Sequence, residues 1–176
     1  MSATRDRCPA DQQQIPVSGP AALPSPEYLM AAFRGQLDDQ SPMARWARDL
    51  ADLWAQLVAA TRARHDIGDL ESVLCEIAQV VREINSWSVF WLPRPYGARR
   101  HTRTFGDEVS HLAGSFAVAF TELMRPAPDH AQLREAWFHL AEARDGYSDL
   151  LAAIHERQVQ LPVVSLPLTI FAAPSA

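Results

Sequence analysis

From residue 25 onward the sequence repeats one pattern, in which a helix-capping residue is followed by apolar side chains at helical spacing. Ser25 and Ser41 each place a hydroxyl before a first-turn proline, which is typical of a helix start. Three more starts have a capping residue three positions before an acid or an amide, which is the capping-box spacing or a close relative of it. These starts are Asp66 with Asp69, Thr104 with Asp107, and Asp129 with Gln132. The pattern predicts five helices in series.

After each of the last four starts, large apolar residues recur at steps of three and four, so each helix has one wide apolar face. Representatives of the four faces are Leu50 and Leu57, Ile77 and Ile84, Leu112 and Phe116, and Leu140 and Tyr147. Long amphipathic helices joined by short turns form antiparallel bundles. We therefore expect an all-α fold, an antiparallel four-helix bundle with an extra short helix at about residues 26–37 across one end.

Both ends of the chain lack this periodicity. Residues 1–24 combine prolines and three consecutive glutamines with few large apolar groups, which predicts a disordered tail before a bundle domain at residues 25–160. Residues 161–176 form an extended segment whose apolar part, Leu161 to Phe171, is broken by two prolines. This segment is expected either to fold back over the bundle or to bind a partner.

Composition limits the classes of protein that the chain can belong to. No apolar run approaches the ~20 residues of a membrane span, and the first residues lack the apolar core of a signal peptide. A cytoplasmic protein without a membrane segment is therefore expected. The formal net charge of -5 argues against nucleic acid as a partner.

One loop reverses this acidic character. Arg94, Arg99, Arg100, His101 and Arg103 lie between the third and fourth long helical patterns, directly before a helix start. Arginines that precede a helix N-terminus can bind a phosphate, a carboxylate or an acidic partner together with the free amides of the first turn. The alternative is a solvated connector, because an acidic side chain of the first turn already occupies the helix N-terminus.

Two further groups of residues are candidates for a pocket. Trp87, Trp91 and Tyr96 gather beside the cationic loop, where they form either part of a ligand pocket or an aromatic plug at one end of the core. Arg144 lies on the apolar face of the last helix. Its guanidinium is either buried and paired with Glu76 or Glu83, or it reaches the surface along its own stem.

Glu108 and His111 form a Glu-x-x-His motif, which is half of the ligand set of a carboxylate-bridged di-metal bundle. No second copy of the motif follows, so a charged outer face is expected and neither a metal nor another cofactor is predicted. Cys8 and Cys75 are interpreted as reduced thiols. No nucleophile has a base beside it, so no catalytic residue is assigned and the enzyme question stays open, with an enzyme disfavoured.

Several short motifs resemble those of small, uncharacterised all-helical proteins of high-GC bacteria, which carry a domain of unknown function. The motifs are Ile84-Asn-Ser-Trp87, Leu92-Pro-Arg-Pro95, Arg100-His-Thr102, Gly106-Asp-Glu-Val109 and Ala141-Glu-Ala-Arg-Asp-Gly-Tyr-Ser-Asp-Leu150. They span roughly the last hundred residues. The resemblance implies an all-helical fold and transfers no activity and no catalytic residue.

Two functions are compatible with these features. The first is a non-enzymatic interaction or accessory protein that docks a protein partner or a second copy of itself through the cationic loop and the apolar C-terminal segment. The second is a small-molecule or anion-binding protein, or an enzyme, with a polar pocket inside the bundle formed by Arg144, Glu108, His111 and the aromatic residues.

Overall fold

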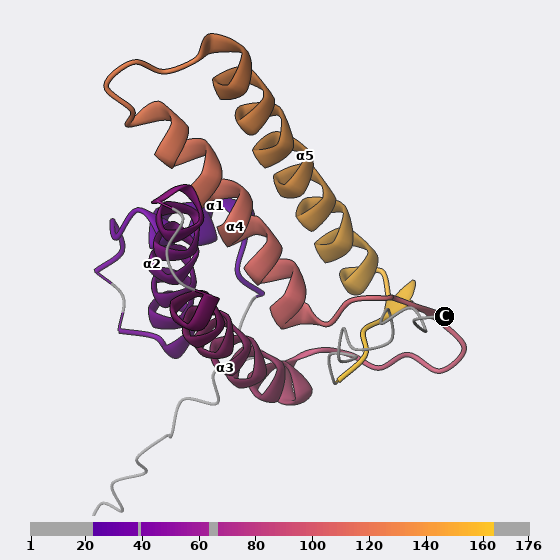
Figure 1. The fold of residues 1–176 in the computed structure, drawn as a ribbon. Helices are drawn as coiled ribbons and strands as arrows, with labels where there is room; N and C mark the ends of the chain where they lie inside the picture. Colours follow the sequence, from indigo (N-terminus) through magenta and orange to yellow (C-terminus); the bar gives the residue numbers. More distant parts are fainter. Residues whose placement is uncertain (1–22, 39, 64–66, 164–176) are drawn as a thin grey trace, which may run out of the picture.

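The computed structural model describes residues 23–38, 40–63 and 67–163, and it shows five helices that pack together (Figure 1). The helices are α1 (Pro26–Phe33), α2 (Pro42–Ala63), α3 (Ile67–Trp91), α4 (Phe105–Leu123) and α5 (His130–His155). This confirms the all-α fold with a short N-terminal helix. Within the described residues no helix combines the length and the apolar character that crossing a lipid bilayer requires.

The helices begin where the capping residues predict. The hydroxyl oxygens of Ser25 and Ser41 accept the N–H groups of Tyr28 and Ala44, each at 3.2 Å. Thr104 and Asp107 form a reciprocal capping box at the start of α4. The carboxylate of Asp129 accepts the N–H of Ala131 at 2.8 Å. The start predicted at Asp66 lies outside the described residues.

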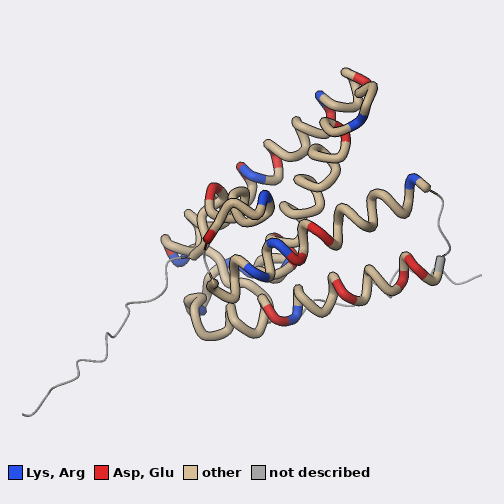
Figure 2. Tube along the Cα trace, turned by 90° about the vertical axis from the view of Figure 1, so that its left-hand side faces the viewer, with Lys and Arg blue, Asp and Glu red and all other residues tan. Residues whose placement is uncertain are grey.

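Helix α4 lies at the centre and contacts all four other helices. It runs parallel to α2, because Trp54 and Arg62 of α2 contact Ser110 and Glu122 of α4 in the same order. Figure 2 shows the α2–α3 and α4–α5 hairpins as two separate pairs of helices. In the described part of the chain α5 contacts α4, α1 and the strand that follows it, but neither α2 nor α3. The side of the bundle where α2 and α5 would meet is therefore open.

The core forms on the predicted apolar faces. Its fully buried large side chains include Leu29, Leu50, Ile84, Phe105, Leu112 and Tyr147. Four residues expected in these faces are instead 42–47 % exposed, namely Leu74, Phe120, Leu123 and Trp137. They lie in the halves of their helices that are remote from the cationic loop, where α5 has no second helix beside it.

Two short strands that the sequence analysis did not predict hold the cationic loop. Strands β1 (Arg99–Arg100) and β2 (Val159–Gln160) pair in parallel, and the N–H groups of Arg99 and His101 donate to the carbonyls of Gln158 and Gln160 at 3.2 and 2.9 Å. Val159 and Leu161 are buried in the core. The described beginning of the C-terminal segment thus folds back over its own bundle, while residues 164–176 lie outside the described residues.

The N-terminal boundary of the domain also differs from the expected one. Leu23 packs against the core and Pro24 is buried, although both were assigned to the tail. The hydroxyl of Tyr147 on α5 donates to the carbonyl oxygen of Pro24 at 2.9 Å. The packed domain therefore includes at least these two residues, and residues 1–22 lie outside the described part.

Candidate functional site

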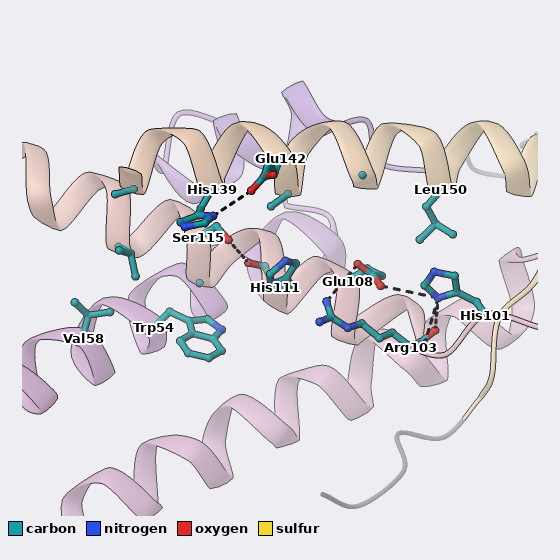
Figure 3. Close-up of a pocket in the computed structure, with 15 residues that line it drawn as sticks. Trp54, Val58, His101, Arg103, Glu108, His111, Ser115, His139, Glu142 and Leu150 are labelled. Carbon is teal, nitrogen blue, oxygen red and sulfur yellow. Dashed lines mark hydrogen bonds and ion pairs between the residues drawn. The ribbon is translucent and has the colours of Figure 1, made fainter. Parts of the chain in front are cut away.

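The open side of the bundle forms a groove between α2 and α5, with α4 as its floor and a volume of about 690 Å³ (Figure 3). We call it the α2–α5 groove. Its apolar lining includes Trp54, Val58, Val118, Ala136, Ala143 and Leu150. Its polar lining consists of His101, Arg103, Glu108, His111, Ser115, His139 and Glu142.

The wall on the α2 side depends on small residues of α4. Trp54 lies against Gly114, where an added Cβ would come within 3.2 Å of the indole ring. The indole N–H of Trp54 donates to the hydroxyl oxygen of Ser110 at 3.0 Å. A larger side chain at either α4 position would displace the indole, so these two residues fix the shape of this wall.

One end of the groove is polar and holds three of the predicted site residues (Figure 3). His101 Nδ1 lies 3.2 Å from the backbone nitrogen and 3.0 Å from the carbonyl oxygen of Arg103, so the ring is held against the backbone of the loop. The Glu108 carboxylate lies 3.9 Å from both His101 Nδ1 and Arg103 Nη1, and its side chain is only 15 % exposed. This carboxylate therefore offsets part of the charge of Arg103.

The middle of the groove carries a second polar group. His139 Nδ1 lies 3.1 Å from a carboxylate oxygen of Glu142, one turn later on α5, and both side chains are more than half exposed. His111 is exposed on α4 opposite this pair (Figure 3). Within the described residues no three His, Cys, Asp or Glu side chains are placed to hold a metal ion. Glu108 and His111 both line the groove.

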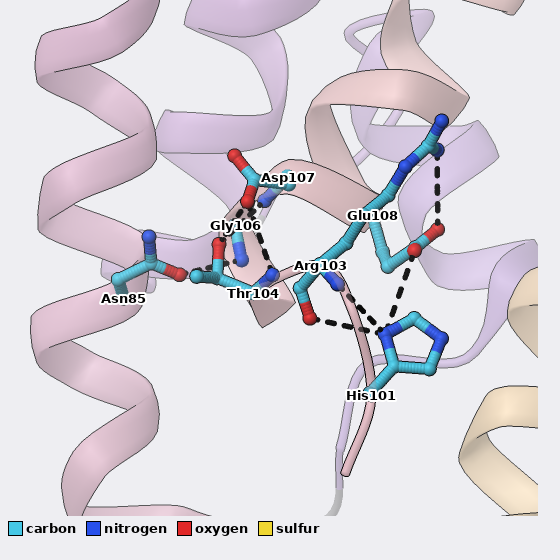
Figure 4. Close-up of polar contacts among 7 residues, drawn as sticks. All are labelled: Asn85, His101, Arg103, Thr104, Gly106, Asp107 and Glu108. Atoms are coloured by element: carbon cyan, nitrogen blue, oxygen red, sulfur yellow. Dashed lines mark hydrogen bonds and ion pairs between the residues drawn. The ribbon is translucent and has the colours of Figure 1, made fainter. Parts of the chain in front are cut away.

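The start of α4 is not available to an anion in the way that the sequence predicted (Figure 4). The N–H of Gly106 donates to Oδ1 of Asn85 at 2.8 Å, and the N–H of Asp107 donates to the Thr104 hydroxyl at 3.2 Å. The N–H of Glu108 donates to the Thr104 carbonyl at 3.2 Å. Since these amides have partners inside the protein, the expected role of the first-turn amides in binding an anion is wrong.

The loop arginines differ in their relation to the groove. Arg103 lines it, with about half of its side chain exposed. Arg99 and Arg100 form β1, so their backbone is paired while their side chains are exposed. Arg94 is also exposed, before β1. The cationic loop therefore forms a charged border at one end of the groove instead of a closed pocket.

The predicted aromatic group divides into two parts. Trp87 stacks on Phe105 and on Trp91, with ring centroids 6.1 and 5.9 Å apart. Phe105 is fully buried, Trp87 is partly buried and Trp91 is 37 % exposed, so the stack leads from the core to the surface. Tyr96 is fully exposed. None of the predicted aromatic residues Trp87, Trp91 and Tyr96 lines the α2–α5 groove.

Arg144 lies at the surface and outside the groove. Its Nη2 donates to a carboxylate oxygen of Glu27 on α1 at 2.7 Å, and this bond holds the pKa of Glu27 below its ordinary value. The predicted partners Glu76 and Glu83 are on α3, which α5 does not contact in the described structure. The suggestion of a buried, paired Arg144 is therefore wrong, because α5 packs beside α1 instead.

His139 and Glu142 are groove residues that the sequence analysis did not select. They follow Glu135 at helical spacing, and Nε2 of His139 lies 3.9 Å from the Glu135 carboxylate. This spacing places the three on one face of α5, but it is equally typical of a solvated helix face. Only the position of α5 relative to α4 shows that the face borders a groove.

Comparisons of the chain with protein-family models, with curated proteins and with solved structures found no match.

Proposed function

We propose that the protein is a non-enzymatic interaction module that binds an amphipathic helix of a partner protein in the α2–α5 groove. The observation that carries the proposal is that α2 and α5, which would be neighbours in a closed four-helix bundle, do not meet. The partner helix would fill this missing side and lie on α4.

A helix suits this groove because helices form its walls. Packed helices lie about 8–10 Å apart and interdigitate through rows of side chains. The apolar face of an incoming helix would cover Trp54 and Val58 on one wall and Ala143 and Leu150 on the other. Recognition of an amphipathic helix by an apolar groove is a recurrent mode of peptide binding.

The charges at the border of the groove favour one kind of partner. Arg103 lines the groove, and the exposed Arg99 and Arg100 directly precede this end of it. Guanidinium groups form strong, often bidentate, hydrogen bonds with carboxylates. We therefore expect the partner helix to carry Asp or Glu at the end that lies beside the loop.

The alternative, a small-molecule or enzyme pocket, has less support. The groove has a volume that a small ligand could occupy. Several of its polar groups, however, lie close to one another: Glu108 is near His101 and Arg103, and His139 is near Glu142. Arg144, which was expected to line such a pocket, lies outside the groove.

Site-specific photo-crosslinking in the source cells tests the proposal. A photoreactive phenylalanine at Val118 would lie in the groove, and the same residue at Val89 on α3 is a control with nearly the same exposure, 38 % against 36 %. We expect a crosslink at position 118 to an amphipathic segment with carboxylates at one end, and none to that segment at position 89. Equal crosslinking at both positions would contradict a specific groove.

The crosslinked segment also identifies the occupant. A segment from this chain itself would show that the groove binds a second copy and would overturn the heterologous partner. A basic or uniformly polar segment would contradict the expected charge complementarity. Native mass spectrometry that reveals a bound small molecule, with no crosslink at position 118, would favour the alternative function.

A further inference from the structure

A second hollow lies between α2 and α3, and it shares no lining residue with the α2–α5 groove. Its volume is about 480 Å³. It is lined by three aromatic residues, Trp46, Trp87 and Phe90, and by four polar residues, Gln79, Arg82, Glu83 and Ser86. We call it the α2–α3 hollow.

Two of its residues are fixed by a short hydrogen bond across the two helices. The indole N–H of Trp46 on α2 donates to a carboxylate oxygen of Glu83 on α3 at 2.6 Å. This bond holds the indole ring of Trp46 beside the negative charge. Only one of the two Glu83 oxygens takes part in it, so the other can face a ligand.

Phe90 has no structural role in the described residues that explains its position. Its side chain is 83 % exposed, although phenylalanine is usually buried. Trp87 differs, because it stacks on the buried Phe105 and on Trp91. A ligand in the hollow would give the Phe90 ring a contact that the protein alone does not provide.

Glu83 is the acidic residue of the lining. Asp49 on α2 lies near Glu83; burial raises the pKa of Asp49, and the smaller raising effects of Asp52 and Glu83 are opposed by Arg45 and Arg48. Arg82 is the basic residue of the lining, and its Nη2 donates to the Gln79 side-chain oxygen at 3.1 Å. Aromatic rings beside a carboxylate are a known arrangement for binding organic ammonium groups, through the negative faces of the rings.

We propose that the α2–α3 hollow binds the alkylated ammonium group of a small organic cation, with Trp46 and Phe90 as aromatic walls and Glu83 as the counter-charge. This site is independent of the proposed function of the α2–α5 groove.

Titration with choline tests the site, and 3,3-dimethyl-1-butanol serves as its uncharged analogue of the same shape. Binding is followed by the indole N–H signals of the tryptophans in two-dimensional NMR, where the signal of Trp46 should shift. We expect saturable binding of choline and binding of the alcohol that is at least about tenfold weaker, because only the cation gains cation–π and ionic contacts. Equal binding of the two probes, or no saturable binding of choline, would overturn the proposal.

Two variants with a matched control separate the site from general effects. Glu83→Gln keeps an oxygen that can accept the Trp46 N–H but removes the charge, and it should weaken choline binding about fivefold. Phe90→Ala should weaken binding about threefold, while Val89→Ala, one residue earlier on α3, should not change it. Wild-type affinity in Glu83→Gln, or equal effects of the two α3 truncations, would contradict the site. Thermal unfolding of each variant shows whether the fold is intact.

Discussion

The backbone N–H of Gly106 in the first turn of α4 donates to Oδ1 of Asn85 on α3 at 2.8 Å (Figure 4). A Cβ atom at position 106 would lie 2.6 Å from the Val81 carbonyl oxygen and 2.8 Å from the same Asn85 oxygen. Only glycine permits this approach of the two helices. The contact fixes the start of α4, and with it the position of Glu108 at the end of the groove.

Gly106→Ala should therefore force α3 and α4 apart and lower the free energy of unfolding by about 1–3 kcal/mol, as in other overpacked cores. Gly146→Ala is the matched control, because a Cβ at this α5 position would meet no atom within 4 Å. The control should be neutral or more stable by up to about 1 kcal/mol, since alanine favours helix over glycine. Denaturation in guanidinium chloride measures both, and equal effects would refute the close-approach argument.

Glu122, near the end of α4, links this helix to α2 through an ion pair. Its carboxylate is buried and forms ion pairs with Arg62 of α2 and with Arg125 just after α4. Glu122→Ala should lower the free energy of unfolding by about 2 kcal/mol, less than for a fully buried pair because both arginines are partly exposed. Urea denaturation measures the change. Glu142→Ala, at an exposed pair with His139, should cost less than about 0.5 kcal/mol. Similar losses in the two variants would show that burial of Glu122 is not the cause.

Tyr147 should make the stability depend on pH in the alkaline range. Burial raises the pKa of its hydroxyl above the ordinary value of about 10. Above pH ~10 the unfolded chain loses this proton while the folded chain keeps it, so the stability contributed by the neutral hydroxyl is lost as pH rises. Chemical denaturation between pH 8 and pH 11, a range chosen to bracket that ordinary value, should show a steeper decline for the wild type than for Tyr147→Phe. Parallel curves would mean that Tyr147 does not cause the decline.

Deletion of residues 1–22 should leave the melting temperature unchanged, whereas deletion of residues 1–24 should lower it. The longer deletion removes Leu23 from the core surface and takes the Pro24 carbonyl away from the buried Tyr147 hydroxyl. An unsatisfied buried hydroxyl costs about 1–3 kcal/mol. Differential scanning calorimetry compares the two truncations with the full chain. An equal melting temperature for all three would show that these contacts do not stabilise the domain.

Conversion of Arg99, Arg100 and Arg103 to glutamine should weaken binding of the partner and flatten its salt dependence, because charges at the border of an interface act mainly on the association rate. The fold should survive, since the strand contacts of β1 use backbone atoms. Surface plasmon resonance at several salt concentrations gives both rates. Unchanged affinity and an unchanged salt dependence would show that the loop is only a solvated connector.

The sequence predicted the helix starts at Ser25, Ser41, Thr104 and Asp129 because capping is a local property, decided by residues three positions apart. The apolar faces were predictable for the same reason. The packing of α1 against α5 could not be predicted from the sequence. Arg144 lies on the same face of α5 as the buried Leu140 and Tyr147. At Arg144, however, this face reaches the edge of α1, so the Arg144 guanidinium bonds Glu27 at the surface.

The groove itself could not be predicted from periodicity. It exists because α5 packs on α4 and α1 and does not reach α2, and this depends on the relative position of whole helices. Glu108 and His111 were named for a possible polar pocket, and both line the groove. The pairing of β1 with β2 could not be predicted from local sequence either, since its backbone hydrogen bonds join residues about sixty positions apart.

The pairing of β1 with β2 can form only late in the synthesis of the chain. The carbonyl groups that hold the cationic loop belong to Gln158 and Gln160, so they leave the ribosome after all five helices have been made. The α2–α3 hairpin can form during translation, because its contacts are complete without this segment. The border of the groove takes its final form only when β2 emerges. A chain that stalls before residue 158 would therefore contain every helix but would lack a fixed cationic loop.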